Sequence, residues 1–335
     1  MAMTNEFRTA CRKAGLALGI LLIFRLVAEG ATLLMSLLLK EFDPTARYII
    51  VTVVSIIFLY ICPMAVTMKV FGYKKSDNRI YYKKSSRLGK AVSWVLPCYG
   101  LGQMINILVL VISFLLANNK NAVEETYAPL TGGATVTSAV TAIVLAVQFI
   151  VIAPLFEEFW FRGIIQTGLT PYGNGFAILI SALLFGLAHG NVHQFCFTFV
   201  VGIVLGYVRY ASDSLIPTMI IHAILNSVSA VILLLITSDP VVSGFAKSQK
   251  GEELNNLENT MIVILGIVFV LVLLFMFAGI ISAISKLKNN RLYRPTNNYP
   301  EMTKREKFIT LIKEPVFIIS VVLSLAFMIV MIFIG

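Results

Sequence analysis

The feature that most constrains this chain is a series of long apolar runs, separated by short polar segments. Nine runs are found, at 14–39, 48–68, 91–116, 136–160, 174–190, 193–210, 214–237, 259–285 and 314–335. A bilayer core of about 30 Å is crossed by about 20 apolar residues in a helix. Lipid offers no hydrogen bonds, so each spanning segment has to satisfy its own backbone. The pattern predicts an all-α polytopic membrane protein with about nine transmembrane helices.

Composition agrees with a membrane location. Hydrophobic residues make up 58% of the 335 residues and charged residues only 13%, whereas a soluble chain has about 25% charged residues. These proportions exclude an ordinary soluble enzyme, a disordered protein and a nucleic-acid-binding domain. The four cysteines lie in or beside the apolar runs and suggest no disulfide framework.

The net charge of +10 is concentrated in alternate polar segments. Lys and Arg number three before the first run, eight in 69–90 and eight in 286–313, but only two in 40–47, one in 117–135 and two in 238–258. Cytoplasmic loops carry the excess of Lys and Arg. We therefore expect the N-terminus in the cytoplasm and the C-terminus outside. The basic segments can also contact anionic lipid headgroups, and the charge needs no nucleic-acid partner.

Charged and imidazole side chains within apolar runs are costly and mark candidate functional sites. Arg25 and Glu29 are four residues apart on one helical face. They form either a structural ion pair or part of a cavity wall. The chain's three histidines, His189, His193 and His222, all fall within 34 residues. Histidine is the side chain best suited to proton transfer near neutral pH.

A helical hairpin brings the first histidine to an acidic pair. The chain turns near 171–175, so residue 157 lies opposite about residue 188. Glu158 and Arg162 are four residues apart, in the favourable order for an ion pair. This leaves Glu157 free to face His189 as a general base.

A third polar patch lies on a later run. His222 and Asn226 share a helical face and offer two N–H donors, which suit a developing oxyanion. Straight, upright helices would nevertheless leave His222 about 15 Å from the depth of His189. Tilt, a break at Gly190 or a displacement at Pro217 has to close that gap. Either patch taken alone has a plainer interpretation, a structural ion pair or interhelical hydrogen bonding.

These patches, in this order, resemble the CPBP family, also called the CAAX-protease or Abi family, which includes the Ras-converting CAAX endopeptidase and many bacterial membrane proteins. The family pattern is EExxxR, then FxxxH, then HxxxN. Here it reads Glu157 to Arg162, Phe185 to His189, and His222 to Asn226. The resemblance covers roughly 140–232.

The resemblance implies an intramembrane endopeptidase with its active site inside the helix bundle. It implies that Glu157 and His189 activate the water, that His222 and Asn226 stabilise the oxyanion, and that Glu158 with Arg162 braces the first glutamate. Family members are described both as metalloproteases and as glutamate-dependent proteases. A zinc site from Glu157, His189 and His222 is one reading. We favour the metal-free reading because the chain has no HExxH. His193 falls outside the pattern and receives no role.

The chain thus divides into N-terminal helices (1–135), a catalytic core (136–237) and C-terminal helices (238–335) in one integral unit. The expected partners are membrane lipid and a membrane-bound peptide or protein substrate, prenylated or bacterial, and the expected location is a bacterial cell membrane. Two other functions stay open. One is a proton-coupled transporter that uses the acidic and histidine groups as a relay. The other is a catalytically silent protein for binding or bacteriocin immunity.

Overall fold

The computed structural model describes residues 2–72, 82, 88–117, 139–289 and 302–334. These residues are almost entirely helical and include no strand. The helices of the first half are α1 (Ala2–Leu38), α2 (Pro44–Ile56), η1 (Ile57–Ile61), α3 (Cys62–Phe71), α5 (Leu88–Val92) and α6 (Val95–Ala117). The central helices are α8 (Ala139–Val147), η3 (Gln148–Ile152), α9 (Ala153–Glu158), η4 (Phe159–Gln166), α10 (Thr167–Leu169), η5 (Thr170–Tyr172), α11 (Asn174–Ala188), α12 (Val192–Ser212) and α13 (Ile216–Ile236). The last are α14 (Asp239–Lys250), α15 (Asn256–Asn289), α16 (Lys304–Ile312) and α17 (Pro315–Ile334).

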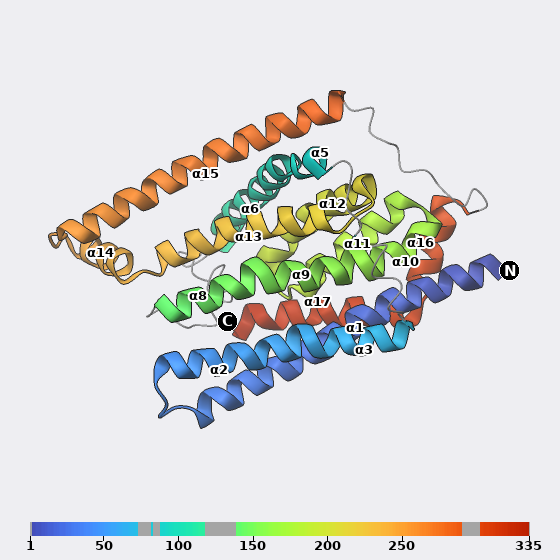
Figure 1. The fold of residues 1–335 in the computed structure, drawn as a ribbon, viewed down its shortest axis with the longest axis horizontal. Helices are drawn as coiled ribbons and strands as arrows, with labels where there is room; N and C mark the ends of the chain where they lie inside the picture. Colours follow the sequence, from blue (N-terminus) through green and yellow to red (C-terminus); the bar gives the residue numbers. More distant parts are fainter. Residues whose placement is uncertain (1, 73–81, 83–87, 118–138, 290–301, 335) are drawn as a thin grey trace.

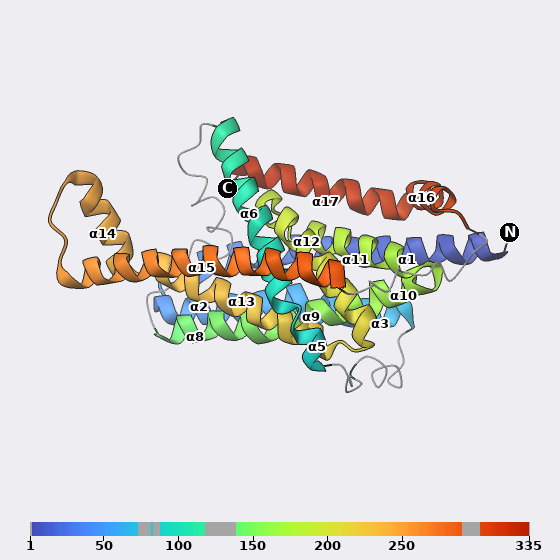
Figure 2. The same ribbon diagram turned by 90° about the horizontal axis from the view of Figure 1, so that it is seen from above.

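Most of the long helices run roughly along one axis of the molecule, and α6 crosses them steeply (Figures 1 and 2). Seven helices of the described residues are long and apolar enough to cross a membrane: 4–38, 44–71, 88–109, 139–172, 194–212, 216–236 and 256–288. The pair α16 and α17 would add an eighth span, although the chain bends there by 71°. This confirms the expected fold class, and the chain is an integral multi-pass membrane protein.

The expected count of nine spans is not confirmed. The run at 174–190 folds as α11, which has only 15 residues and is about 22 Å long. That length falls short of a bilayer core of about 30 Å. Instead α11 forms a hairpin with α12, in which Gly202 of α12 packs closely on Ala182 of α11. The hairpin therefore supplies one span and one short helix.

Prolines and caps explain several helix boundaries. Asp43 caps α2 by accepting a hydrogen bond from the Ala46 N–H at 3.0 Å, with Pro44 in the first turn. Pro63 and Pro154 lie directly after the π-helical segments η1 and η3. Proline has no N–H to donate, so the regular helical ladder is interrupted at these two points.

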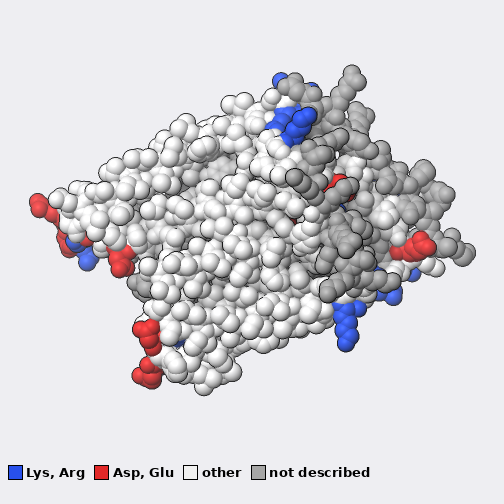
Figure 3. Space-filling view, in the orientation of Figure 1, with Lys and Arg blue, Asp and Glu red and all other residues white. Residues whose placement is uncertain are grey.

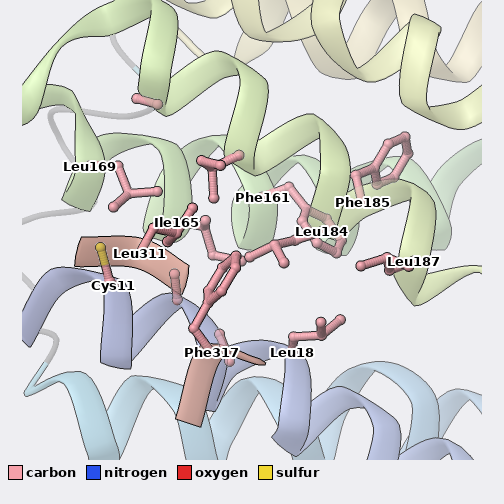
Figure 4. Close-up of a cluster of buried hydrophobic side chains, with 14 of the residues drawn as sticks. Cys11, Leu18, Phe161, Ile165, Leu169, Leu184, Phe185, Leu187, Leu311 and Phe317 are labelled. Carbon is pink, nitrogen blue, oxygen red and sulfur yellow. The ribbon is translucent and has the colours of Figure 1, made fainter. Parts of the chain in front are cut away.

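The main core lies where α1, η4, α11 and α17 meet. Figure 4 shows side chains of these helices converging, among them Leu18, Phe161, Leu184 and Phe317, which are at most 3% exposed. A buried carboxylate, Glu314, lies at the bend between α16 and α17. It accepts a hydrogen bond from Arg12 at 2.9 Å and has Arg8 at 3.7 Å. This contact fixes the N-terminal helix against the last span.

On the other side of the bundle, α15 packs chiefly on α6. Gly279 of α15 faces Gly100 of α6 so closely that a Cβ on Gly100 would lie 2.6 Å from the Gly279 Cα. Most of the remaining α15 surface is exposed and apolar. Two glycines thus allow the backbones to meet, as is common between membrane helices.

Charged side chains are separated along the molecule. In the view of Figure 3 most of the visible Asp and Glu lie at one end, and most of the visible Lys and Arg lie at the other, the end that carries the N-terminus in Figure 1. The apolar surface between the two ends is the belt expected for contact with lipid tails. Which end faces the cytoplasm stays a prediction.

Candidate active site

The site begins with an ion pair that is wholly removed from solvent. Arg162 of η4 donates from Nη1 to Oε1 of Glu158 in α9 at 2.9 Å, and both side chains are 0% exposed. The guanidinium also lies over the ring of Phe185, 4.3 Å from its centre. This confirms the predicted pairing of Glu158 with Arg162.

His222 of α13 joins this pair. Its Nδ1 lies 2.8 Å from Oε1 of Glu158, and its Nε2 lies 3.8 Å from Oε2 of Glu157. Glu158 thus contacts both His222 and Arg162, and its role in bracing Glu157 stays a prediction. The two glutamates have different surroundings, because Glu158 has a cationic partner and Glu157 is the more exposed, at 19%.

The depth of His222 follows from the turn before α13. Ser214 and Leu215 are fully buried, and Leu215 packs with Phe159 and Ile164 of η4. The helix α13 therefore starts alongside η4. His222, six residues after the first residue of α13, therefore reaches Glu158. This closes the gap that straight helices would have left.

Glu157 has a second neighbour that the sequence interpretation missed. The Tyr60 hydroxyl of η1 lies 3.4 Å from Oε1 of Glu157 and donates to it. A tyrosine in the middle of an apolar run needs a partner for its hydroxyl. The sequence therefore indicates that the Tyr60 hydroxyl has a hydrogen-bond partner, but it does not indicate which residue that partner is.

His189 ends α11, and its ring turns toward its own helix. Its Nδ1 lies 2.8 Å from the Phe185 carbonyl oxygen. Because a carbonyl can only accept, Nδ1 carries the hydrogen and Nε2 is the acceptor of the neutral ring. The Phe185 ring meets His189 edge-on at 4.8 Å and His222 at 5.8 Å between ring centres. The two histidines thus share the Phe185 ring.

The expected contact between Glu157 and His189 is replaced by other partners. Within the described part of the chain, Glu157 is bonded to Tyr60 and lies beside His222. His189 is the C-terminal cap of α11, and its Nδ1 is held by that helix. The two residues therefore belong to the same cluster through Phe185 and His222.

Asn226 lies one helical turn beyond His222. Its Nδ2 donates to the Phe149 carbonyl oxygen at 2.8 Å, and Phe149 belongs to the π-helical segment η3. An amide NH₂ has two hydrogens, so a second N–H is left for another acceptor. The structure therefore holds Asn226 against η3. The sequence predicted that Asn226 faces the same point as His222.

Arg25 of α1 reaches the end of α11. Its Nη1 donates to the carbonyl oxygens of Ala188 at 2.9 Å and His189 at 2.6 Å. Glu29 is more distant, 3.8 Å from Nε, and its side chain is half exposed. The predicted ion pair thus exists, and Arg25 also contacts the end of the helix that carries His189. A place in a cavity wall stays a prediction. His193 lies in α12, and its side chain falls outside the described residues.

Residues 139–228 match the model of the family described as type II CAAX prenyl endopeptidase Rce1-like. This segment contains all the residues of the three predicted patches and agrees with the expected 140–232 to within a few residues at either end. Over these residues the chain is similar to the CAAX protease family. Neither the curated proteins nor the solved structures contain a significant match.

The matched family is one of endopeptidases. The matched segment runs from α8 to most of α13. It leaves out α1, α2, η1 and α3, which carry Arg25 and Tyr60.

The described residues include no group of three or more His, Cys, Asp or Glu side chains placed to hold a metal ion. The trio Glu157, His189 and His222 therefore does not fit a zinc site in this arrangement. We therefore derive no step through a metal.

Proposed function

We propose that this chain hydrolyses a peptide bond of a membrane-associated substrate with a water molecule activated by Glu157. One observation carries the proposal: the two adjacent glutamates have separate partners. Glu158 is paired with Arg162, whereas Glu157 is 19% exposed and lies beside Tyr60 and His222. A carboxylate without a guanidinium partner can take a proton from water, and a paired one serves better as a fixed charge.

In the proposed reaction, the water oxygen attacks the carbonyl carbon of the scissile bond while Glu157 takes one of the water's protons. The tetrahedral intermediate then collapses, the C–N bond breaks, and Glu157 returns the proton to the leaving amine. The products are a carboxylic acid, which keeps the other proton of the water, and an amine, and Glu157 ends as it began. His189, with Nε2 as the acceptor of its neutral ring, would accept a hydrogen bond from the same water.

The oxyanion would be met by His222 and Asn226. Glu158 holds Nδ1 of His222 at 2.8 Å, which orients the ring and stabilises it when both nitrogens carry hydrogen. Nε2, the nitrogen that lies toward Glu157, is then a charged donor. Asn226 keeps one amide N–H beyond its bond to Phe149. Two donors fixed on one helix need no rearrangement as the charge develops.

For the substrate we propose a lipid-anchored peptide of the prenylated CAAX type. Support comes from the description of the matched family. The position of the catalytic groups adds to it, because Glu157 and His222 lie within helices that are long and apolar enough to cross the membrane. A substrate held in the bilayer by its own lipid can reach such groups sideways from the lipid phase.

The test uses the full chain in proteoliposomes with a farnesylated CAAX peptide that carries a fluorophore and a quencher. We expect cleavage by the unaltered protein and a loss of at least about 100-fold in Glu157→Ala and in His189→Ala, since a general base contributes about 10²- to 10⁴-fold. Matched controls are Glu41→Ala, an exposed glutamate, and His193→Ala. The unprenylated peptide shows whether the lipid is required.

Full activity in both variants would refute the assignment of Glu157 and His189. The transporter alternative predicts a different outcome: flux driven by a pH gradient in the same proteoliposomes, with no peptide cleaved. A silent binding protein would show neither cleavage nor flux.

A further inference from the structure

The N-terminal hairpin formed by α1 and by α2, η1 and α3 contacts the catalytic cluster at two points. Both contacting residues, Arg25 and Tyr60, lie outside the segment that matches the family, 139–228. Figure 1 shows α1 running beside α17, and α1 also contacts α11, the helix that ends at His189. The question is what a distant hairpin does at this site.

Arg25 binds the end of the helix that carries His189. The last carbonyls of a helix have no partner within the helix. A single nitrogen of Arg25 donates hydrogen bonds to two carbonyl oxygens at this end, those of Ala188 and His189. A cation at this position also complements the negative end of the helix dipole.

Two neighbours indicate that this placement is built into the fold. Gly190 has a φ of +62°, and a Cβ there would lie 2.9 Å from Cζ of Arg25 and 2.6 Å from the Phe327 ring. Only glycine fits both the backbone angle and the space. The guanidinium in turn lies 5.2 Å from the centre of the Phe327 ring on α17. A charged side chain in an apolar span is costly unless it has such partners.

Tyr60 acts at the other half of the cluster. Its hydroxyl lies 3.4 Å from Oε1 of Glu157, the oxygen opposite the one that faces His222. A donor on one oxygen and a histidine on the other restrict the rotation of the carboxyl group. Tyr60 is positioned for this contact by the π-helical segment η1, which precedes Pro63 in the first turn of α3.

We propose that the N-terminal hairpin supplies two positioning residues for peptide hydrolysis, Arg25 for His189 and Tyr60 for Glu157. The inference rests on the function proposed above. It extends that function by making the family segment incomplete as an active site without the hairpin. Positioning has a large effect on rate, since a displacement of about 1 Å can cost about 100-fold.

The kinetic experiment measures kcat and KM per folded molecule in the proteoliposome assay. We expect Arg25→Gln to lower kcat by about 10- to 100-fold and Tyr60→Phe by about three- to tenfold, as for loss of a charged and a neutral hydrogen bond. KM should stay within about twofold, because neither residue is assigned a substrate contact. Arg25→Lys should restore part of the rate. Matched controls in the same two candidate spans, 4–38 and 44–71, are Arg8→Gln and Tyr48→Phe, which should keep the full rate.

A second measurement does not depend on cleavage. The chain has three histidines, so ¹⁵N spectra of the imidazole rings in detergent can be assigned with three single His→Gln variants. Arg25→Gln should shift the His189 ring signals, and Tyr60→Phe should shift those of His222 through Glu157. Arg8→Gln and Tyr48→Phe should leave all three rings unchanged.

The outcomes separate the two proposals. If the unaltered protein cleaves no peptide, the proposed function fails and the ring spectra still decide the positioning. If the protein is active, a normal kcat in both Arg25→Gln and Tyr60→Phe overturns the inference and leaves the function in place. Unchanged ring spectra in both variants overturn it as well. A loss of folded protein with a normal kcat would show that the hairpin only stabilises the fold.

Discussion

Arg162 is a charged side chain with no access to solvent and one carboxylate partner, Glu158, at 2.9 Å. Removing one member of a buried ion pair leaves the other charge uncompensated, at a cost of about 3–5 kcal/mol. We therefore expect Arg162→Met to lower the free energy of unfolding by that amount. Denaturant titration of the protein in mixed detergent micelles measures it.

The matched control is Arg305→Met, because Arg305 is an exposed arginine of α16. It should change the free energy of unfolding by less than about 0.5 kcal/mol. An Arg162→Met protein as stable as the unaltered chain would mean that Glu158 is not ionised beside it, and the division of roles between the two glutamates would lose its basis.

Metal dependence is a second question at the residue scale. Glu157, His189 and His222 do not group as a metal site in the described residues. We expect 1,10-phenanthroline to leave the cleavage rate within about twofold of its starting value, like its non-chelating isomer 1,7-phenanthroline. Loss of activity with the chelator alone, restored by zinc, would contradict the metal-free mechanism.

How much of the site could be predicted from sequence differs from one residue to the next. Glu158 and Arg162 are four residues apart on one helix, so their pairing follows from helix geometry alone. Tyr60 and Arg25 approach the cluster from helices about 100 or more residues away in sequence. Such contacts depend on how helices pack, and a spacing rule within one segment does not contain that information.

At the scale of elements, the apolar runs predicted which residues form helices. They did not predict how far each helix is shifted along the bundle axis relative to its neighbours. The start of α13 was expected at the level of the previous turn. Instead Leu215 packs against η4, and His222 is thereby lowered to Glu158. Offsets of this kind arise from side-chain packing at a turn.

The contact between α6 and α15 predicts that alanine at two glycines of α15 changes the free energy of unfolding in different directions. A Cβ on Gly279 would overlap the Leu96 carbonyl oxygen and lie 2.7 Å from the Gly100 Cα, whereas Gly266 on the same helix has nothing within 4 Å. Gly279→Ala should lower the free energy of unfolding by about 1–3 kcal/mol through overpacking.

Gly266→Ala should be neutral or slightly stabilising, because alanine favours a helix over glycine by up to about 1 kcal/mol. The same denaturant titration compares the two variants. In both, kcat per folded molecule should stay normal, since none of the catalytic residues lies on α6 or α15. Equal stabilities for the two variants would refute the close packing of these helices.

At the scale of the whole molecule, charge and topology predict an orientation. Most of the visible acidic groups lie at one end of the bundle and most of the visible basic groups at the other (Figure 3). The positive-inside rule then places 69–90 and 286–313 in the cytoplasm and 238–258 outside. Two exposed positions report the opposite sides: Ser248 in α14 and Lys304 in α16.

The measurement labels single cysteines in a variant without the four native cysteines, using a maleimide that does not cross the membrane of intact cells. Ser248→Cys should react in intact cells, and Lys304→Cys only after the membrane is opened. Labelling of Lys304→Cys but not Ser248→Cys in intact cells would show that the topology is the reverse of the predicted one. An inverted topology would put the basic segments outside, where their contact with the anionic cytoplasmic leaflet is lost. It would also turn the N-terminal hairpin, with Arg25 and Tyr60, so that it enters the bilayer from the outer face.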